Sequence, residues 1–409
     1  MIPDNESISR ILTLRYDPCK NSPRARLTEC DFRPQKRLHN IESRIINIIK
    51  NDLIEKYRKL KFKDVSLALS SGIDSRLTLA MIRSFLPDVR VNCVCVGFGD
   101  KDDELDRARE IARTYDCDFN GLVLDDVLSE LPKLITIVKE PRWNLYHYYA
   151  FESGKKRSDL FYTGDGGDEL FGGYTFRYHK FLSLLGKDTP IEWKERARLY
   201  LSCHDRDWVP DQDNLFGPEV KFSWQEIYSL FKSYFDNDLN PLDQVFLADF
   251  NGKLLYDWLP TNIAFSNFLK VSIESIFLTN NMIAFATHVP WQKKYDPQTQ
   301  TGKIPLRSIM RKQKGYEKVE AAKKGFSIDL VSMWNRNARE IVTTYVNGDA
   351  EIVRNGLVSR KWIQRATESV LRGNVELNTR YISKMLSILA LEIWYKLFVS
   401  KTMDRKQKL

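Results

Sequence analysis

Long apolar runs and clustered metal-ligating residues are both scarce in this sequence. No apolar stretch is long enough to span a bilayer, and the first residues have neither the basic flank nor the apolar stretch of a secretory signal. The 6 cysteines are scattered, and no second Cys or His pair accompanies Cys93 and Cys95. A transmembrane protein and a metal site at Cys93 are therefore disfavoured, and we expect a reducing, cytoplasmic setting without a membrane partner.

The composition is that of a globular protein with a large core. Of the 409 residues, 43% are hydrophobic and 29% are charged, which is enough for one large domain or two moderate ones. The formal net charge is +9. Such an excess suits a nucleic acid, a polyphosphate ligand or a solvated surface. Because the sequence contains no recognisable RNA-binding module, nucleic acid is the disfavoured partner.

The chain divides into a short extension and one long domain. Residues 1–40 contain several prolines, many charges and little periodicity, so we interpret them as an N-terminal extension, with one strand over 11–16. An apolar stripe at helical spacing over 41–57 opens the domain, which we expect to span 41–409.

Strand and helix patterns alternate over the first part of this domain. Apolar runs at 65–69, 89–96, 119–124 and 160–163 predict strands, and helical patterns at 73–85, 102–115 and 125–138 separate them. This alternation predicts an α/β fold with a doubly wound parallel sheet, whose ligands bind beyond the carboxyl ends of the strands. The stretches 175–257, 259–289 and 330–398 predict a helical C-terminal part, and 259–289 is expected to cover the active end of the sheet.

The first predicted strand ends in a turn of small residues, Ser70-Ser71-Gly72-Ile73-Asp74-Ser75, that opens a helix. Free backbone N–H groups and the positive end of the helix dipole would make this turn a phosphate cradle. The alternative is an ordinary strand-to-helix turn, with Asp74 as a helix cap. No Gly-Lys-Ser/Thr follows, so the turn is not a Walker loop.

A second loop follows the strand at 160–163 and holds 5 glycines and 3 acidic residues within residues 164–174. Glycines let a backbone approach a ligand closely, and carboxylates hold divalent cations. A solvated acidic turn is the alternative, but the adjacent apolar Leu170 and Phe171 argue against it.

The first loop resembles the Ser-Gly-Gly-x-Asp-Ser loop of enzymes that split ATP between the α and β phosphates. The second resembles the signature of the asparagine synthetase family, and the two occur in the order of that family. Ser71 replaces the first glycine of the family loop, and serine tolerates positive φ poorly, so we expect the loop to close slightly differently. The resemblance implies an adenine-nucleotide α-hydrolase-like (ATP-pyrophosphatase) sheet.

The resemblance also implies roles for individual residues. ATP would be bound by Ser70, Ser71, Gly72, Asp74, Ser75, Gly164, Asp165, Gly166 and Gly167. Mg²⁺ would be held by Asp74 and Asp168, because magnesium typically takes one or two protein carboxylates together with phosphate oxygens.

Two further matches fall where the sequence departs from the family. Lys323 matches the lysine of Arg-Pro-Lys-x-Gly-Phe, without the Arg-Pro pair, and would stabilise negative charge. Glu274 matches the catalytic glutamate, but the following Ala-Arg-Val-Pro-Phe-Leu-Asp is replaced by a shorter run. A surface lysine and an exposed glutamate are the alternatives. Because the losses surround the acceptor pocket, we expect a carboxylate substrate other than aspartate.

Glutamine-dependent members of the family begin with a glutaminase domain whose nucleophile is Cys at position 2. Here position 2 is Ile, so we expect ammonia, an amine or a separate glutaminase partner to supply the nitrogen. The resemblance thus implies an AMP-forming carbon–nitrogen ligase that adenylates a small-molecule or peptide carboxylate. The alternatives are a macrolactam or side-chain amide synthetase acting on a peptide or natural-product precursor, an RNA-modifying pyrophosphatase and a non-catalytic nucleotide-binding relative.

Overall fold

Five parallel strands form the central sheet. The computed structural model describes residues 5–35, 37–99, 103–186, 192–204, 206–314, 330–372 and 379–409. The strands are β1 (Asp64–Ala68), β2 (Arg90–Gly97), β3 (Asp118–Val123), β4 (Leu160–Thr163) and β5 (Ser272–Ser275), in the order β3-β2-β1-β4-β5. Leu67 of β1 lies opposite Cys93 of β2 and Tyr162 of β4. The strand order reverses between β1 and β4, which is where such sheets bind ligands.

Helices cover both faces of the sheet, so the doubly wound α/β prediction is confirmed. Along β2, Cys93 and Cys95 pack in the core that includes α2 (Ile41–Leu60), α3 (Ile73–Phe85) and α4 (Glu104–Thr114). Val94 and Val96 point the other way, into the core that includes α5 (Leu131–Val138) and α6 (His147–Lys155). This alternation is the period-2 pattern of a strand buried on both faces.

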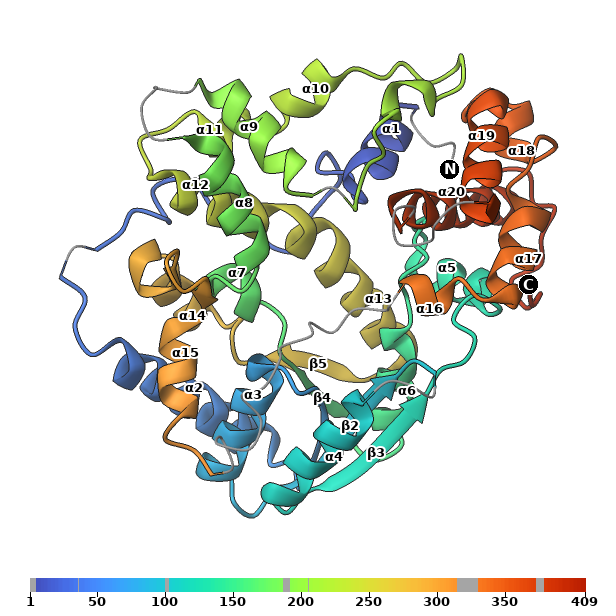
Figure 1. Cartoon of the computed structure of the whole chain (residues 1–409). Helices are drawn as coiled ribbons and strands as arrows, with labels where there is room; N and C mark the ends of the chain where they lie inside the picture. Colours follow the sequence, from blue (N-terminus) through green and yellow to red (C-terminus); the bar gives the residue numbers. More distant parts are fainter. Residues whose placement is uncertain are drawn as a thin grey trace.

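A layer of helices lies above the sheet in Figure 1, on the side where β4 leads into α7 (Gly167–Phe171). It begins with α8 (Thr175–Leu185), α9 (Trp193–Ser202), η1 (Gln212–Asn214), α10 (Trp224–Ser229), α11 (Lys232–Phe235), α12 (Pro241–Asp249), the π-helix η2 (Phe250–Trp258) and α13 (Leu259–Leu269). After β5 come α14 (Asn280–Ala286), η3 (Trp291–Lys293), a two-stranded sheet of β6 (Tyr295–Asp296) and β7 (Thr301–Gly302), and α15 (Ile304–Met310).

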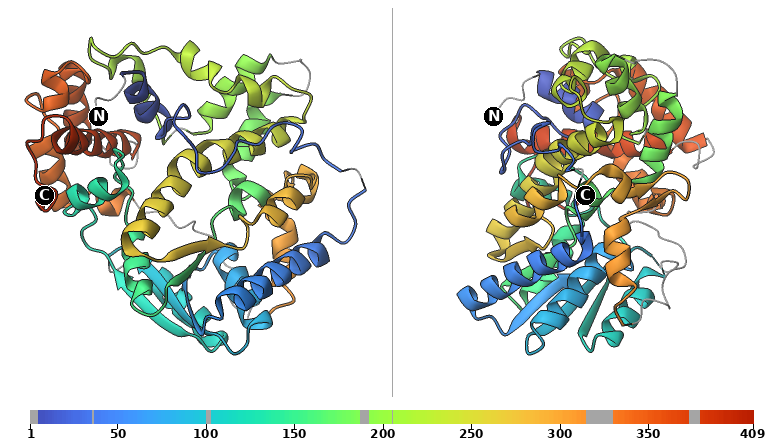
Figure 2. Two further views of the ribbon diagram at one scale, coloured as in Figure 1. Left: turned by 180° about the vertical axis from the view of Figure 1, so that it is seen from behind. Right: turned by 90° about the vertical axis from the view of Figure 1, so that its left-hand side faces the viewer.

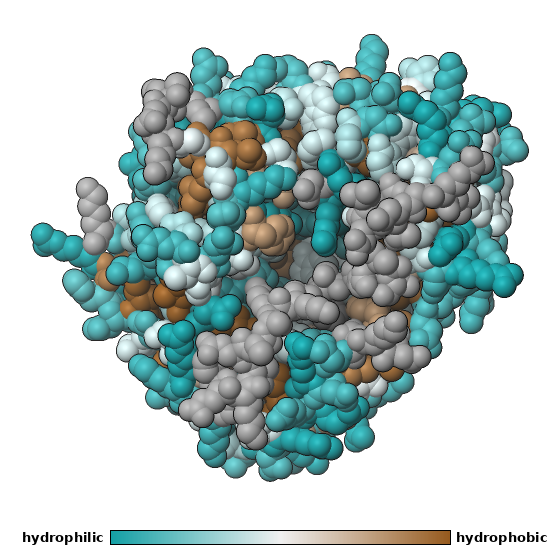
Figure 3. Space-filling model, in the orientation of Figure 1, coloured by the Kyte–Doolittle hydropathy of each residue, from teal (hydrophilic) through white to brown (hydrophobic). Residues whose placement is uncertain are grey.

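The C-terminal region is helical, as expected from its sequence. It comprises α16 (Leu330–Met333), α17 (Arg336–Tyr345), α18 (Glu351–Arg354), α19 (Arg360–Arg372) and α20 (Thr379–Phe398). Figure 2 shows these helices grouped at one side of the molecule, beside the N-terminal helix. Within the described ranges, no helix is both long and apolar enough to cross a membrane. The face drawn in Figure 3 is mostly hydrophilic, with separate hydrophobic patches.

Three local predictions were wrong. Instead of the strand expected over 11–16, residues 11–14 form the end of α1 (Asn5–Leu14), because Ile8, Ile11 and Leu12 follow helical spacing and are buried. The helix expected over 125–138 begins only at Leu131. The helical stretch expected over 259–289 is interrupted by β5, because α13 ends at Lys270 in a left-handed conformation (φ 55°) and the chain then pairs with β4.

Candidate active site

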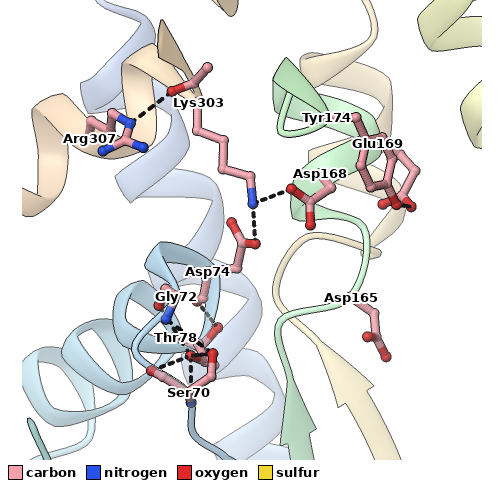
Figure 4. A network of polar contacts seen from close by, with 12 residues as sticks. Ser70, Gly72, Asp74, Thr78, Asp165, Asp168, Glu169, Tyr174, Lys303 and Arg307 are labelled. Carbon is pink, nitrogen blue, oxygen red and sulfur yellow. Dashed lines mark hydrogen bonds and ion pairs between the residues drawn. The ribbon is translucent and has the colours of Figure 1, made fainter. Parts of the chain in front are cut away.

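The two predicted loops meet at the carboxyl ends of β1 and β4. Asp74 lies in the first turn of α3, and Asp168 lies in α7. Both carboxylates contact the ammonium group of Lys303, and the distance from Lys303 Nζ to Asp168 Oδ1 is 2.6 Å (Figure 4). One cation from elsewhere in the chain therefore joins the two carboxylates that the sequence proposed as a pair.

Glycines of the second loop make room for this cluster. A Cβ atom at Gly167 would lie 2.6 Å from Asp74 Cγ, and one at Gly164 would lie 2.9 Å from Asp74 Cβ. At Gly173 a Cβ would lie 1.6 Å from Asp168 Oδ1 and 2.4 Å from Lys303 Cε. A side chain at any of these positions would displace Asp74, Asp168 or Lys303, so the glycine-rich sequence allows the two loops to pack against one another.

Lys303 is held in place by its backbone as well as by its charge. It has left-handed backbone angles (φ 56°), and its N–H donates to Phe171 O at 3.0 Å. The preceding Gly302 packs directly on the backbone of Gly172, because a Cβ there would lie 2.0 Å from Gly172 O. Burial alone would lower the pKa of Lys303, but Asp168 and Asp74 raise it above its usual value. The lysine is therefore charged at neutral pH.

Hydroxyl groups close the first loop on itself. Ser70 N donates to Ser75 Oγ at 3.0 Å, the two hydroxyls lie 3.0 Å apart, and Gly72 N donates to Ser70 Oγ at 3.2 Å. Gly72 is the N-cap of α3 with φ −66°, and Ser71 is not among the residues with positive φ. The serine that replaces the family glycine thus fits this backbone without strain.

Ser71 also binds a carboxylate from the neighbouring helix. Its N–H donates to Glu104 Oε1 at 2.5 Å and its hydroxyl to Glu104 Oε2 at 2.7 Å. Glu104 begins α4, after the end of β2. A carboxylate therefore occupies a backbone N–H of the loop that was predicted to bind phosphate.

In the second loop, Glu169 is buried and Asp165 is half-buried, and both side chains point away from Lys303 (Figure 4). Asp165 accepts hydrogen bonds from Trp258 Nε1 at 2.6 Å and Asn262 Nδ2 at 2.8 Å. Burial raises the pKa of Asp165, against the effect of these bonds. Burial and the negative charge of Asp168 raise the pKa of Glu169 to about 8, although Tyr174 donates to it at 2.6 Å.

Glu274, one of the two remaining predicted residues, lies apart from this cluster. The carboxylate of Glu274, in β5, pairs with Lys56 of α2 at 2.5 Å and accepts from Ser272 Oγ at 2.8 Å. Its side chain is 32% exposed. Lys323 lies outside the described residues.

The site suits a cation, although the described residues contain no group of three or more His, Cys, Asp or Glu side chains placed to hold a metal ion. Asp74 and Asp168 already share one positive charge, that of Lys303. Two carboxylates are the usual protein contribution to a magnesium ion that is also bound by phosphate. Asp74 and Asp168 are therefore the residues that fit Mg²⁺.

Sequence patterns alone did not single out Lys303 or Glu104. Lys303 belongs to neither predicted loop, and Glu104 lies within the helix predicted over 102–115 without a role of its own. A Gly-Lys pair directly before a helix with proline at its second position was the available signal for Lys303.

The comparisons with known proteins agree with these motifs. The family model described as asparagine synthase matches residues 56–396. The glutamine-hydrolysing asparagine synthetase 1 of Bacillus subtilis (strain 168) is 26% identical over 164 residues, which make up 38% of this chain and 25% of that protein. The match thus spans a quarter of the length of that relative.

Two solved structures are more distantly similar. The U34-tRNA thiolase NcsA from Methanococcus maripaludis has 12% identity and a TM-score of 0.26, over 58% of this chain and 87% of that one. NAD+ synthetase from Burkholderia pseudomallei has 12% identity and a TM-score of 0.23, over 66% of this chain and 97% of that one.

Proposed function

The chain belongs to the asparagine synthase family, and we propose that it is an ATP-dependent synthetase that adenylates a carboxylate and transfers the acyl group to ammonia or an amine. The observation that carries this proposal is the Asp74–Lys303–Asp168 cluster between the two loops. It combines two carboxylates for a metal-bound triphosphate with a fixed cation at the switch point of the sheet.

The chemistry requires activation of a poor electrophile. A carboxylate reacts slowly with amines because its leaving group would be oxide, whereas an acyl-adenylate expels AMP. When bound, Mg²⁺ would neutralise charge on the triphosphate. The turn from Ser70 to Ser75 would hold phosphate oxygens through N–H groups at the start of α3, and the charged Lys303 would stabilise negative charge nearby.

Lys323 and Glu274 are proposed to take part in the reaction in different roles. Lys323 would add a second cation toward pyrophosphate. Glu274, which pairs with Lys56, is proposed for the acceptor side, and the altered residues that follow it favour a carboxylate substrate other than aspartate. A peptide or natural-product carboxylate, closed to an amide by its own or another amine, is therefore the second candidate.

ATP–pyrophosphate exchange tests the proposal directly. We expect exchange to depend on one class of carboxylate within a panel of amino acids, small acids and peptides, each tried with ammonium, with glutamine and with neither. Asp74→Ala should abolish exchange, whereas Asp88→Ala, at an exposed position, should preserve it. Exchange that persists in Asp74→Ala would refute the metal role.

Two further outcomes would redirect the assignment. Tight RNA binding that weakens steeply with salt would favour an RNA-modifying enzyme. ATP binding without exchange for any carboxylate would favour a non-catalytic relative. Amide formation from glutamine by the chain alone would contradict the proposed need for a separate ammonia source.

A further inference from the structure

A cluster of positive charge lies at the amino ends of three strands of the central sheet. Its seven exposed cations come from the end of α2 and from the turns before β1, β4 and β5, and we call them the basic patch: Arg58, Lys59, Lys61, Lys63, Lys156, Arg157 and Lys270. Within the parts of the chain that the structure describes, none of the seven forms an ion pair with a carboxylate.

Contacts between the turns make the basic patch continuous. Ser158 Oγ donates to Asp64 O at 2.7 Å, which joins the turn before β4 to the turn before β1. Lys155 Nζ donates to the carbonyl of Lys270 at 2.7 Å, which joins the end of α6 to the turn before β5. Because β1, β4 and β5 are neighbours in the sheet, the basic patch is one surface assembled from three distant parts of the sequence.

The acidic residues in these turns are already paired. Stretches 57–64, 155–159 and 268–272 contain two acidic residues, Asp64 and Asp159. Asp64 pairs with Arg90 at 2.7 Å, and Asp159 pairs with Lys155 at 2.5 Å. The basic patch therefore keeps seven positive charges, in a chain whose formal net charge is +9. Such a concentration of one sign of charge attracts an anionic surface.

Exposed apolar side chains lie among these cations. Leu60, between Lys59 and Lys61, is 51% exposed, and Phe268, two residues before Lys270, is 54% exposed. Single exposed apolar residues are common on protein surfaces, but here two of them occur within one cluster of cations. The interface of an anionic membrane takes both kinds of side chain at once, cations at the head groups and apolar groups at the acyl boundary.

We propose that the basic patch binds the surface of an anionic membrane, with its cations on lipid head groups and with Leu60 and Phe268 in the interfacial layer. Each lysine or arginine near such a surface adds about fivefold to the affinity. A surface contact of this kind needs no spanning helix. Our expectation from the sequence that the chain has no membrane partner rested on spanning segments and secretory signals, which do not bear on such a contact.

A single-stranded nucleic acid fits this surface less well. Nucleic acids of this kind bind by stacking their bases on aromatic faces beside a basic track. The ring of Tyr57 packs edge to face on Phe62, with centroids 5.5 Å apart, and the ring of Phe268 is tilted against Tyr148 at 6.3 Å. Leu60 has no ring. The apolar part of the surface is therefore better suited to lipid than to bases.

The position of the basic patch leaves the candidate active site free. Asp74 and Asp168 follow the carboxyl ends of β1 and β4, whereas the basic patch lies at the amino ends of the same strands. Strands of this length separate their two ends by about 15 Å. Figure 2 shows α2 at the end of the molecule that carries the sheet, away from the helical layer. Membrane binding is thus independent of the proposed synthetase activity.

Vesicle sedimentation with the full chain tests the inference. Vesicles of phosphatidylcholine alone are compared with vesicles that also contain about 30% phosphatidylserine. We expect the anionic vesicles to bind the protein at least about tenfold more tightly than the neutral ones, and we expect salt to weaken this binding because exposed charges are screened.

Two variants and a control locate the binding surface. Four exposed cations of the basic patch are replaced in Arg58→Gln/Lys59→Gln/Lys156→Gln/Arg157→Gln, which should bind anionic vesicles at least about 20-fold more weakly. The control replaces four exposed cations outside the basic patch, in Lys194→Gln/Lys221→Gln/Arg354→Gln/Lys361→Gln. It has the same net charge as the first variant and should bind like the wild type. Circular dichroism checks the folding of each variant.

The second variant, Leu60→Ser/Phe268→Ser, keeps every charge and removes the two exposed apolar side chains. It should bind anionic vesicles about tenfold more weakly, because apolar burial contributes to interfacial binding. Equal binding of the wild type to both kinds of vesicle, or an equal loss in the control, would overturn the inference. So would tight binding of single-stranded RNA that the first variant loses and the second keeps, because it would assign the basic patch to nucleic acid.

Discussion

Replacing Lys303 with methionine is the sharpest test of how the candidate active site is assembled. Methionine keeps the length of the side chain and removes its charge. The Lys303 side chain is only 2% exposed, while those of Asp74 and Asp168 are 15% and 33% exposed. Without Lys303, the two carboxylates would lose the positive charge that now contacts both of them.

The size of the effect follows from this burial. Removing one partner of a buried ion pair costs about 3–5 kcal/mol. Because Asp168 is partly solvated, we expect the lower end, ~3 kcal/mol, which is a factor of about 100 in the folding equilibrium. Urea denaturation at pH 7 measures this loss. Lys293→Met, at an exposed position, is the control and should change stability by less than about 0.5 kcal/mol.

Magnesium provides the second arm of this test. Because Lys303→Met removes the positive charge that both carboxylates contact, millimolar Mg²⁺ should restore part of the lost stability, about 2.7 kcal/mol if its concentration is 100 times its Kd. The rescue should disappear when Asp168→Asn is added. A Lys303→Met variant within about 1 kcal/mol of the wild type would refute the view that this lysine compensates the two carboxylates.

Three further predictions concern neighbouring residues. Glu104→Gln should tighten ATP binding about fivefold, measured by titration calorimetry, because the side chain that accepts from Ser71 N–H would no longer carry a negative charge that repels phosphate. Weaker binding would mean that Glu104 instead maintains the shape of the loop. Ser71→Gly should lower the free energy of unfolding by about 1.5 kcal/mol, measured by thermal denaturation. The variant loses the hydrogen bond from the Ser71 hydroxyl to Glu104 and gains entropy in the unfolded state, while there is no positive φ at Ser71 for glycine to relieve. A variant more stable than the wild type would contradict this prediction. The pKa of Glu169 is raised to about 8 in the folded protein, so the folded state favours the protonated carboxyl group. The contribution of this group to the free energy of unfolding is therefore complete below its unfolded-state pKa and is lost as the pH rises through 8. Glu169→Gln should therefore be a few kcal/mol more stable than the wild type at pH 9 and should lose this advantage at pH 4. The control, Glu226→Gln at an exposed position, should show no such dependence on pH. Equal pH profiles of stability for Glu169→Gln and the wild type would refute the raised pKa of Glu169.

The meeting of the two loops was predictable because it depends on strand order and local pattern. Buried strands of four to eight residues followed by small residues place Asp74 and Asp168 at one edge of a parallel sheet. Strand β5 was not predictable in the same way. Ser272 is exposed, the other three residues are half-buried, and the strand carries no alternating pattern, so tertiary pairing with β4 decides its conformation.

Lys303 was missed for a different reason. It is 229 positions from Asp74, and the feature that places it is the contact between the Gly302 and Gly172 backbones. Such a contact between distant parts of the chain leaves no periodic trace in the sequence. Glu104 was missed because an acidic residue in the first turn of a helix already has a local explanation in the helix dipole.

The glycine-rich loop shows why a motif can be identified correctly for an incomplete reason. Its glycines were expected to admit a ligand, yet Gly164 and Gly167 accommodate Asp74, and Gly173 accommodates Asp168 and Lys303. The two carboxylates are therefore placed by packing against backbone and are partly neutralised by Lys303, a cation of the chain itself. Since this assembly is complete within the protein, we infer that magnesium is required with the nucleotide and not for folding, so that the site meets its ligand already in position.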